Sequence, residues 1–157
     1  MKTKKIIGLF LTLSLVLTAS LAFAQPMRGE MKGWQGSGGW GMGTQYQRMY
    51  NPKATETITG TVESVDKITP MRGMNYGVHI TVKTDKETIS VHLGPGWYYI
   101  ERLDTNNIEN GDKVEVKGSR ITMMGTPAII AAEVKKGDSV LKLRDENGFP
   151  VWAGWKR

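Results

Sequence analysis

Residues 78–93 of this 157-residue chain read VHITVKTDKETISVHL, and their alternation decides how the sequence folds. Apolar side chains occupy every second position on both sides of a short polar interval, which is the pattern of two β-strands joined by a tight turn. A two-residue loop at Asp85 and Lys86 sets a register in which apolar residues pair with apolar residues. The same register pairs His79 with His92 on the polar face. We therefore expect the chain's two histidines to lie side by side.

The rest of the chain predicts a small all-β barrel around this hairpin. Gly60 interrupts an earlier strand-like run, and we expect a bulge or bend there of the kind that lets a closed sheet turn a corner. Gly-Pro-Gly at 94–96 predicts a sharp stop for the second hairpin strand, followed by a short helix. Three strands, a short helix and two strands give the connectivity of the OB-fold, a five-stranded barrel. A C-terminal β extension follows, in which Trp152 and Trp155 are expected to close a barrel end. The expected elements are strands at 57–68, 76–84, 87–93, 113–121 and 127–135, a helix at 97–103 between strands 3 and 4, and a sixth strand at 140–143.

The first 24 residues have the features of a secretory signal peptide. Three lysines precede an apolar run at 6–16, and Ala-Phe-Ala at 22–24 predicts cleavage directly after it. We expect a periplasmic or otherwise exported soluble protein with no stable membrane anchor after cleavage; an uncleaved, membrane-tethered form is the alternative. Cleavage lowers the formal net charge from +6 to +3, because the segment contains three lysines and no acid. The basicity of the whole chain therefore does not indicate nucleic-acid binding.

Residues 25–54 differ in composition from the rest of the chain. Seven glycines and almost no aliphatic residues predict a flexible arm, since such a segment buries too little apolar area to offset its ordering entropy. Its methionines and tryptophans allow an alternative in which the arm handles copper, because thioether sulfur is a ligand for Cu(I). We favour a linker, since the methionine spacing repeats no ligand motif. The predicted organisation is a signal peptide at 1–24, the arm at 25–54, and an OB-fold-like domain with its extension at 55–157.

Three motifs resemble a bacterial family. They are GPGWY at 94–98, GDKVEVKGS at 111–119 and LRDENGFPVWAGW at 143–155. In this order they resemble exported OB-fold proteins of the magnetosome MamS/MamX type, over roughly residues 56–157. The resemblance implies an OB barrel and, for members linked to magnetosomes, a part in iron handling or redox control during mineral growth. Some members have c-type haem motifs; this chain contains no cysteine, so no c-type haem, thiolate site or disulfide is expected and only the barrel module carries over.

The paired histidines are the candidate metal site. Cross-strand partners have β-carbons about 4.5 to 5.5 Å apart, close enough for His79 and His92 to share one ion. Imidazole nitrogen suits copper and zinc, and Met71 and Met74, in the loop before the first hairpin strand, would add ligands that favour Cu(I). Periplasmic copper chaperones of the CusF type are similar in being small OB barrels with histidine, methionine and tryptophan ligands, and by residue type Trp97 is their counterpart here. The alternative is two exposed histidines without a metal, whose closeness would lower the pKa of the pair.

The sequence offers no catalytic constellation. Neither histidine has an acid at an obvious supporting position, as a nucleophilic triad requires. The predicted function is therefore a non-enzymatic exported binding or accessory module of the cell envelope, with an unknown envelope protein or a metal ion as its partner. A metal chaperone with copper or zinc on the histidine pair is the first alternative. Oligonucleotide binding is the second, and it is disfavoured because export removes the ligand and the polar hairpin face has no interleaved aromatic residues.

Overall fold

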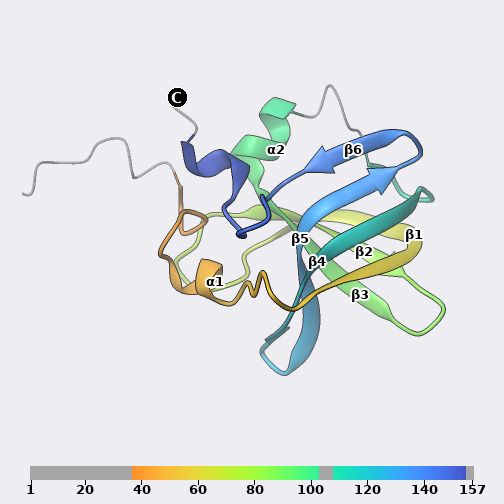
Figure 1. Cartoon of the computed structure of the whole chain (residues 1–157), viewed down its shortest axis with the longest axis horizontal. Coiled ribbons are helices and arrows are strands. Elements are labelled where there is room, and N and C mark those ends of the chain that lie inside the picture. Colours follow the sequence, from red (N-terminus) through yellow and green to blue (C-terminus); the bar gives the residue numbers. More distant parts are fainter. Residues whose placement is uncertain (1–36, 103–107, 155–157) are drawn as a thin grey trace, which may run out of the picture. The chain divides into compact units, whose positions relative to one another are not determined.

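The structure is a computed structural model that describes residues 37–102 and 108–154. Its elements in chain order are α1 (Gln45–Arg48), β1 (Thr55–Ile68), β2 (Gly77–Lys83), β3 (Thr88–Pro95), α2 (Gly96–Arg102), β4 (Lys113–Met123), β5 (Thr126–Lys136), β6 (Ser139–Lys142) and the 3-10 helix η1 (Val151–Gly154). The strands form one sheet in the order β3-β2-β1-β4-β5-β6, and a parallel pairing of β3 with β5 closes the first five into a barrel (Figure 1). Since α2 joins β3 to β4, the connectivity is that of the OB-fold. The predicted fold class, an all-β five-stranded barrel with a C-terminal β extension, is confirmed.

The hairpin of β2 and β3 has the predicted register. Thr84 N donates to Glu87 O at 2.8 Å across the two-residue turn. His79 and His92 are Cα partners, as the alternation of apolar residues required. The apolar members of both strands point into the barrel, so the histidines belong to its outer face.

The end of β3 differs from the prediction. A register shift just beyond the histidines leaves Leu93 as an extra residue, and the strand continues past this expected last residue, with Pro95 paired to Gly77. Gly96 N then donates to Tyr76 O at 3.1 Å. The strand thus stops within Gly-Pro-Gly as predicted, at Pro95 rather than directly before the motif, because proline is tolerated at a strand end where the ladder needs no N–H from it.

β1 belongs to both halves of the barrel. Its first part pairs with β4 and its second part with β2, and the change of partner falls at Thr61. At the neighbouring Gly60, a Cβ atom would lie 2.3 Å from Lys83 O, so only glycine permits this close crossing. The expected bulge at Gly60 is found instead at Glu63, where the β1–β2 register shifts.

One continuous hydrophobic core fills the barrel. The alternating inward positions of β2, β3 and β4 supply it, together with a continuous run in β5, which is covered on both sides. No helix within the described residues is long and apolar enough to span a lipid bilayer. The buried aliphatic side chains of the barrel include Val62, Ile80, Val82, Ile89, Val91, Leu93, Val114, Val116, Ile129 and Ile130.

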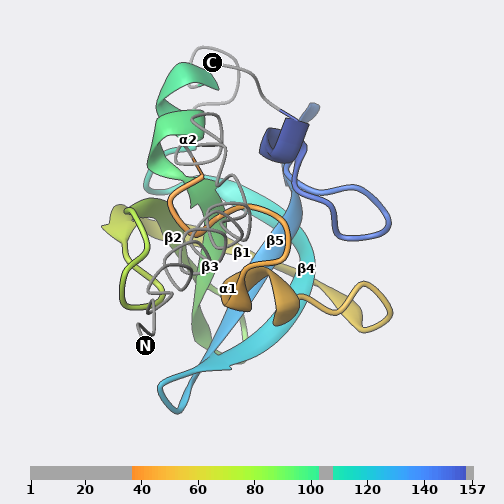
Figure 2. The same cartoon turned by 90° about the vertical axis from the view of Figure 1, so that its left-hand side faces the viewer.

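The described part of the predicted arm, residues 37–54, packs against the barrel. Trp40 is 1% exposed, and Tyr46 and Tyr50 are also buried in the core. Figure 2 shows this segment and α1 running along the barrel before the chain enters β1. The expectation of a flexible arm is thus wrong for these residues, because aromatic rings supply the apolar area that aliphatic side chains do not. The predicted signal peptide and residues 25–36 lie outside the described residues, as does Trp155.

We expect Trp40→Ala to lower the free energy of unfolding by about 3–5 kcal/mol, because it removes a fully buried ring from a filled site. Phe149→Ala, at a half-exposed ring, should change it by about 0.5 kcal/mol or less. Urea unfolding followed by far-UV circular dichroism measures both. A loss for Trp40→Ala as small as that expected for Phe149→Ala would contradict the prediction.

The turn between β4 and β5 places a methionine in an unfavourable backbone conformation. Met124 and Gly125 form a two-residue turn with φ values of 50° and 80°. An L-residue in the left-handed region costs about 1–2 kcal/mol, which glycine avoids and asparagine reduces. The Met124 side chain is 99% exposed and gains no packing in return.

Met124→Asn should therefore stabilise the protein by about 1 kcal/mol, and Gly125→Ala should destabilise it by a similar amount. Thermal unfolding of the two variants beside the parent chain tests the prediction. A lower Tm for Met124→Asn would contradict it.

Candidate functional site

The two histidines lie together, and each is already hydrogen bonded. Their ring centroids are 6.4 Å apart in an edge-to-face arrangement, with 76° between the ring planes. His79 Nδ1 bonds with Ser90 Oγ at 2.7 Å, and His92 Nδ1 bonds with the Tyr46 hydroxyl at 2.9 Å. Only the Nε2 atom of each ring is therefore available for a ligand that leaves these bonds intact.

Aromatic rings from the arm cover the inner histidine. Tyr46 stacks on His92 with centroids 5.9 Å apart, and Trp40 meets Tyr46 edge-on at 4.9 Å. Trp40 Nε1 donates to Asn75 O at 2.9 Å, which anchors the outermost ring to the loop before β2. We call Trp40, Tyr46, His92 and His79 the ring stack; within it, His92 is 2% exposed and His79 is half-buried.

The arm can approach the start of β2 closely because Gly77 lies at the contact. Trp40 rests directly on Gly77, where a Cβ atom would fall 2.1 Å from the indole Cζ2. Thr44 caps the short helix α1 by accepting from Gln47 N at 3.2 Å, which sets the direction in which Tyr46 leaves the backbone. The ring stack is therefore positioned by local backbone geometry as well as by ring contacts.

Burial keeps the ring stack uncharged. It lowers the pKa of His92 from 6.5 to about 4, with a smaller contribution from the nearby His79. The pKa of His79 is also lowered by burial, while Asp66 opposes the shift. Burial raises the pKa of the Tyr46 hydroxyl, so this group stays protonated at neutral pH. The predicted lowering of the histidine pKa values is found, but loss of water outweighs the repulsion between the rings.

The structure supplies one acid that the sequence did not reveal. Asp66 on β1 is the Cα partner of His79, so the expectation that neither histidine has a supporting acid is wrong for this residue. Asp66, His79 and Ser90 thus lie on the adjacent strands β1, β2 and β3, with Ser90 diagonal to His79 rather than opposite it. Their order differs from a nucleophilic triad, because Ser90 bonds Nδ1 and no hydrogen bond joins Asp66 to the ring. His79 and Ser90 line neither the hollow beside Arg120 nor the hollow beside Arg144.

The predicted methionine ligands pack as apolar side chains. Met71 and Met74 are half-buried against the hydrophobic core, and so is Trp97. Met74 lies beneath Gly39 of the arm, where a Cβ atom would come within 2.7 Å of its Cγ. Within residues 37–102 and 108–154, no group of three or more histidine, aspartate and glutamate side chains could hold a metal ion. The histidines are thus brought together as predicted, and thioether ligation remains a prediction.

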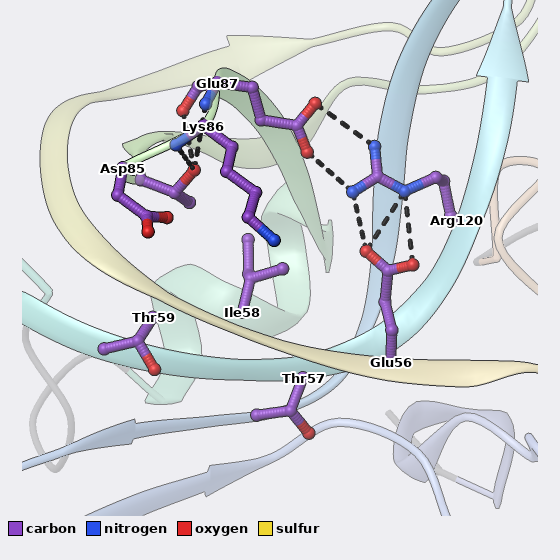
Figure 3. A pocket seen from close by; sticks show the side chains of 9 residues that line it. Glu56, Thr57, Ile58, Thr59, Asp85, Lys86, Glu87 and Arg120 are labelled. Carbon is purple, nitrogen blue, oxygen red and sulfur yellow. Dashed lines mark hydrogen bonds and ion pairs between the residues drawn. The ribbon is translucent and has the colours of Figure 1, made fainter.

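A hollow of about 460 Å³ lies between the tip of the β2–β3 hairpin and the first half of β1. Arg120 spans one side of it, with Nη2 at 2.6 Å from both Glu56 Oε1 and Glu87 Oε1. Figure 3 shows this clamp and the Lys86 side chain reaching from the hairpin turn toward Ile58. The pKa of Glu87 is lowered, chiefly by its hydrogen bond with the guanidinium. Because the three partners are about one-third exposed, we expect the clamp to fix the hairpin tip with little net stabilisation.

A second charged group, missed by the sequence reasoning, lies between the arm and the C-terminal extension. Arg144 is 3% exposed and donates from Nη1 to Gln47 Oε1 and, at 3.3 Å, to Gly148 O. Trp152 Nε1 donates to Trp40 O at 2.8 Å and closes the same region. The motif at 143–155 contained this arginine, but sequence spacing gives no sign that the side chain is buried.

By fold, the chain is a small all-β barrel protein with OB-fold connectivity. The profile of the MamS/MamX magnetosome protein family matches residues 54–141, more than half of the chain, and the protein therefore belongs to this family. The resemblance noted in the sequence is confirmed. No curated protein matches the chain. The matched range contains both histidines but excludes Tyr46, Arg144 and Trp152.

The low pKa of His92 predicts how stability depends on pH. A base whose folded pKa lies below its unfolded value stabilises the fold fully above about pH 6.5, and this contribution is lost as pH falls toward 4. We expect the loss at His92 to be about 3 kcal/mol. Denaturant unfolding at pH 7 and pH 4 should show a drop that is smaller by about this amount in His92→Gln. His79→Gln serves as the control and should retain most of the drop; identical pH dependence in all three proteins would contradict the prediction.

Proposed function

We propose that this protein is a non-enzymatic, exported accessory module of the cell envelope that presents its barrel as a rigid binding unit to a partner. One observation carries the proposal. The outer face of β2 and β3, through which OB barrels bind their ligands, is covered at His92 by the chain's own Tyr46 and Trp40. A binding face partly occupied by the protein itself, at His92, favours a structural or adaptor role over capture of a ligand at that position.

Family membership supports an accessory role. The family is described as a magnetosome protein family, and its match covers β1 to β5, the strands that make the barrel. The signal-peptide pattern of residues 1–24 supports export, and a cysteine-free composition suits a module that does not attach c-type haem. Together these features support the proposal of a partner outside the cytoplasm, in an envelope system linked to metal or redox handling.

A metal chaperone is the second candidate, and the closeness of His79 and His92 is the observation that favours it. Copper or zinc would have to bind the two Nε2 atoms while each Nδ1 keeps its hydroxyl partner, and further ligands would have to come from outside the ring stack. The burial of His92 beneath Tyr46 works against rapid loading. Oligonucleotide binding gains no comparable support, since Tyr46 and Trp40 are packed inward rather than presented for base stacking.

The test uses the mature chain beginning at Gln25. We expect osmotic shock to release a protein with this N-terminus. We also expect cross-linking in living cells to join it to one defined envelope protein. Titration with Cu(I), Cu(II) and Zn(II) against competing chelators should give no sub-micromolar binding. Sub-micromolar affinity that is lost in both His79→Ala and His92→Ala, but kept in Met71→Leu, would replace the accessory role with histidine-based metal transfer.

A further inference from the structure

Arg144 has hydrogen-bonding capacity that the protein does not use. A guanidinium has five N–H donors in a fixed fork. Nη1 is engaged by Gln47 and Gly148, whereas the buried Nε has no partner and Nη2 makes no hydrogen bond to the described residues. Nε and Nη2 lie on the same edge of the guanidinium plane. This free edge has the geometry with which arginine binds two oxygens of one carboxylate or phosphate.

The charge of Arg144 is also uncompensated. No carboxylate of the described residues lies within ion-pair distance of it, although burial of an unpaired guanidinium is costly. The rings of Tyr50 and Trp152 flank it, with centroids 5.2 Å and 5.1 Å from its Cζ. These cation–π contacts hold the guanidinium in place.

A hollow of about 220 Å³ adjoins this arginine and has room for several water-sized groups. Glu133 on β5 is the Cα partner of both Lys117 on β4 and Lys142 on β6, so a row of charges crosses the sheet beside the hollow. The lining residues are Tyr50, Pro52, Thr55, Lys117, Ala132, Glu133, Lys142, Arg144, Asp145 and Glu146.

The acids of this lining are partly engaged elsewhere. Asp145 Oδ1 accepts from the backbone N–H groups of Asn147 and Phe149 at 2.9 Å, which holds this carboxylate in its own turn. Glu133 Oε1 lies 3.8 Å from Lys135 Nζ. Three basic and three acidic side chains line the hollow, so its net charge does not attract a long polyanion. Recognition must come from the guanidinium edge, which selects a compact group.

We propose that the hollow beside Arg144 is a binding site for a compact oxyanion, a carboxylate or a phosphate, which contacts the guanidinium at Nη2, with Lys142 and Lys117 at the rim. The ligand occupies the free Nη2 donors and neutralises the buried charge. The hollow shares no lining residue with the ring stack, and the proposal goes beyond the accessory role. Binding of an oxyanion at this site can therefore be tested without knowing the envelope partner, and its failure would leave the proposed accessory role unaffected.

The experiment follows the Arg144 Nε–Hε signal of the mature chain by NMR. Inorganic phosphate and acetate are titrated in separate arms at constant ionic strength, with sodium chloride as the reference salt. We expect a saturable shift with at least one oxyanion and none with chloride; the arm that saturates at lower concentration identifies the ligand class. No saturable shift in either arm, or the same shift with chloride, would overturn the proposal.

Two variants test the mechanism in opposite directions. Arg144→Lys keeps the charge but loses the fork, and should weaken binding about tenfold. Glu133→Gln removes a rim carboxylate and should tighten binding about two- to threefold. Backbone amide shifts around the hollow report binding to Arg144→Lys, and its circular dichroism spectrum checks the fold. If Arg144→Lys does not fold, Lys142→Ala takes its place and should weaken binding; unchanged affinity in the folded variants would overturn the proposal.

Discussion

The packing of Trp40 and Tyr46 on the outer face of the β2–β3 hairpin is the contact on which the rest of the structure depends. It removes His92 from water and gives its Nδ1 atom a hydroxyl partner, so the imidazole stays neutral. It also joins distant parts of the chain, because the carbonyl of Trp40 accepts from the indole of Trp152 in the C-terminal extension. Arm, barrel and extension therefore share one core, and we expect them to unfold together.

The register of the hairpin from its turn to the histidine pair could be predicted residue by residue, whereas the end of β3 and the surroundings of the hairpin could not. Period-two alternation with a two-residue turn admits one register that pairs apolar with apolar, and a slip by one residue would turn every side chain to the wrong face. Tyr46 lies 46 positions from His92 in a segment without hydrophobic periodicity, so no pattern connects them. Asp66 was hidden for a different reason. The bulge at Glu63 shifts the β1–β2 register, and that shift decides which residue faces His79.

Family membership and the chain's particular features come from different parts of the sequence. The family match covers the barrel strands and both histidines, so the barrel is what this protein shares with its family. The residues that cover the histidines, and the arginine with a free guanidinium edge, belong to the arm and the extension on either side of the match. In an OB barrel, ligand selection is set by what surrounds the strands. Here the flanking segments close one surface of the barrel and build a hollow at another.

The contact between Trp40 and Gly77 restricts how these two positions can change in evolution. Because the indole occupies the space where any other residue would place its β-carbon, neither position can change freely while the other remains. A family member with a larger residue at the position of Gly77 must have lost or displaced the indole, and with it the cover over the imidazole. Covariation of these two sites across homologous barrels would therefore separate members whose histidine is sealed from members in which it is open to solvent.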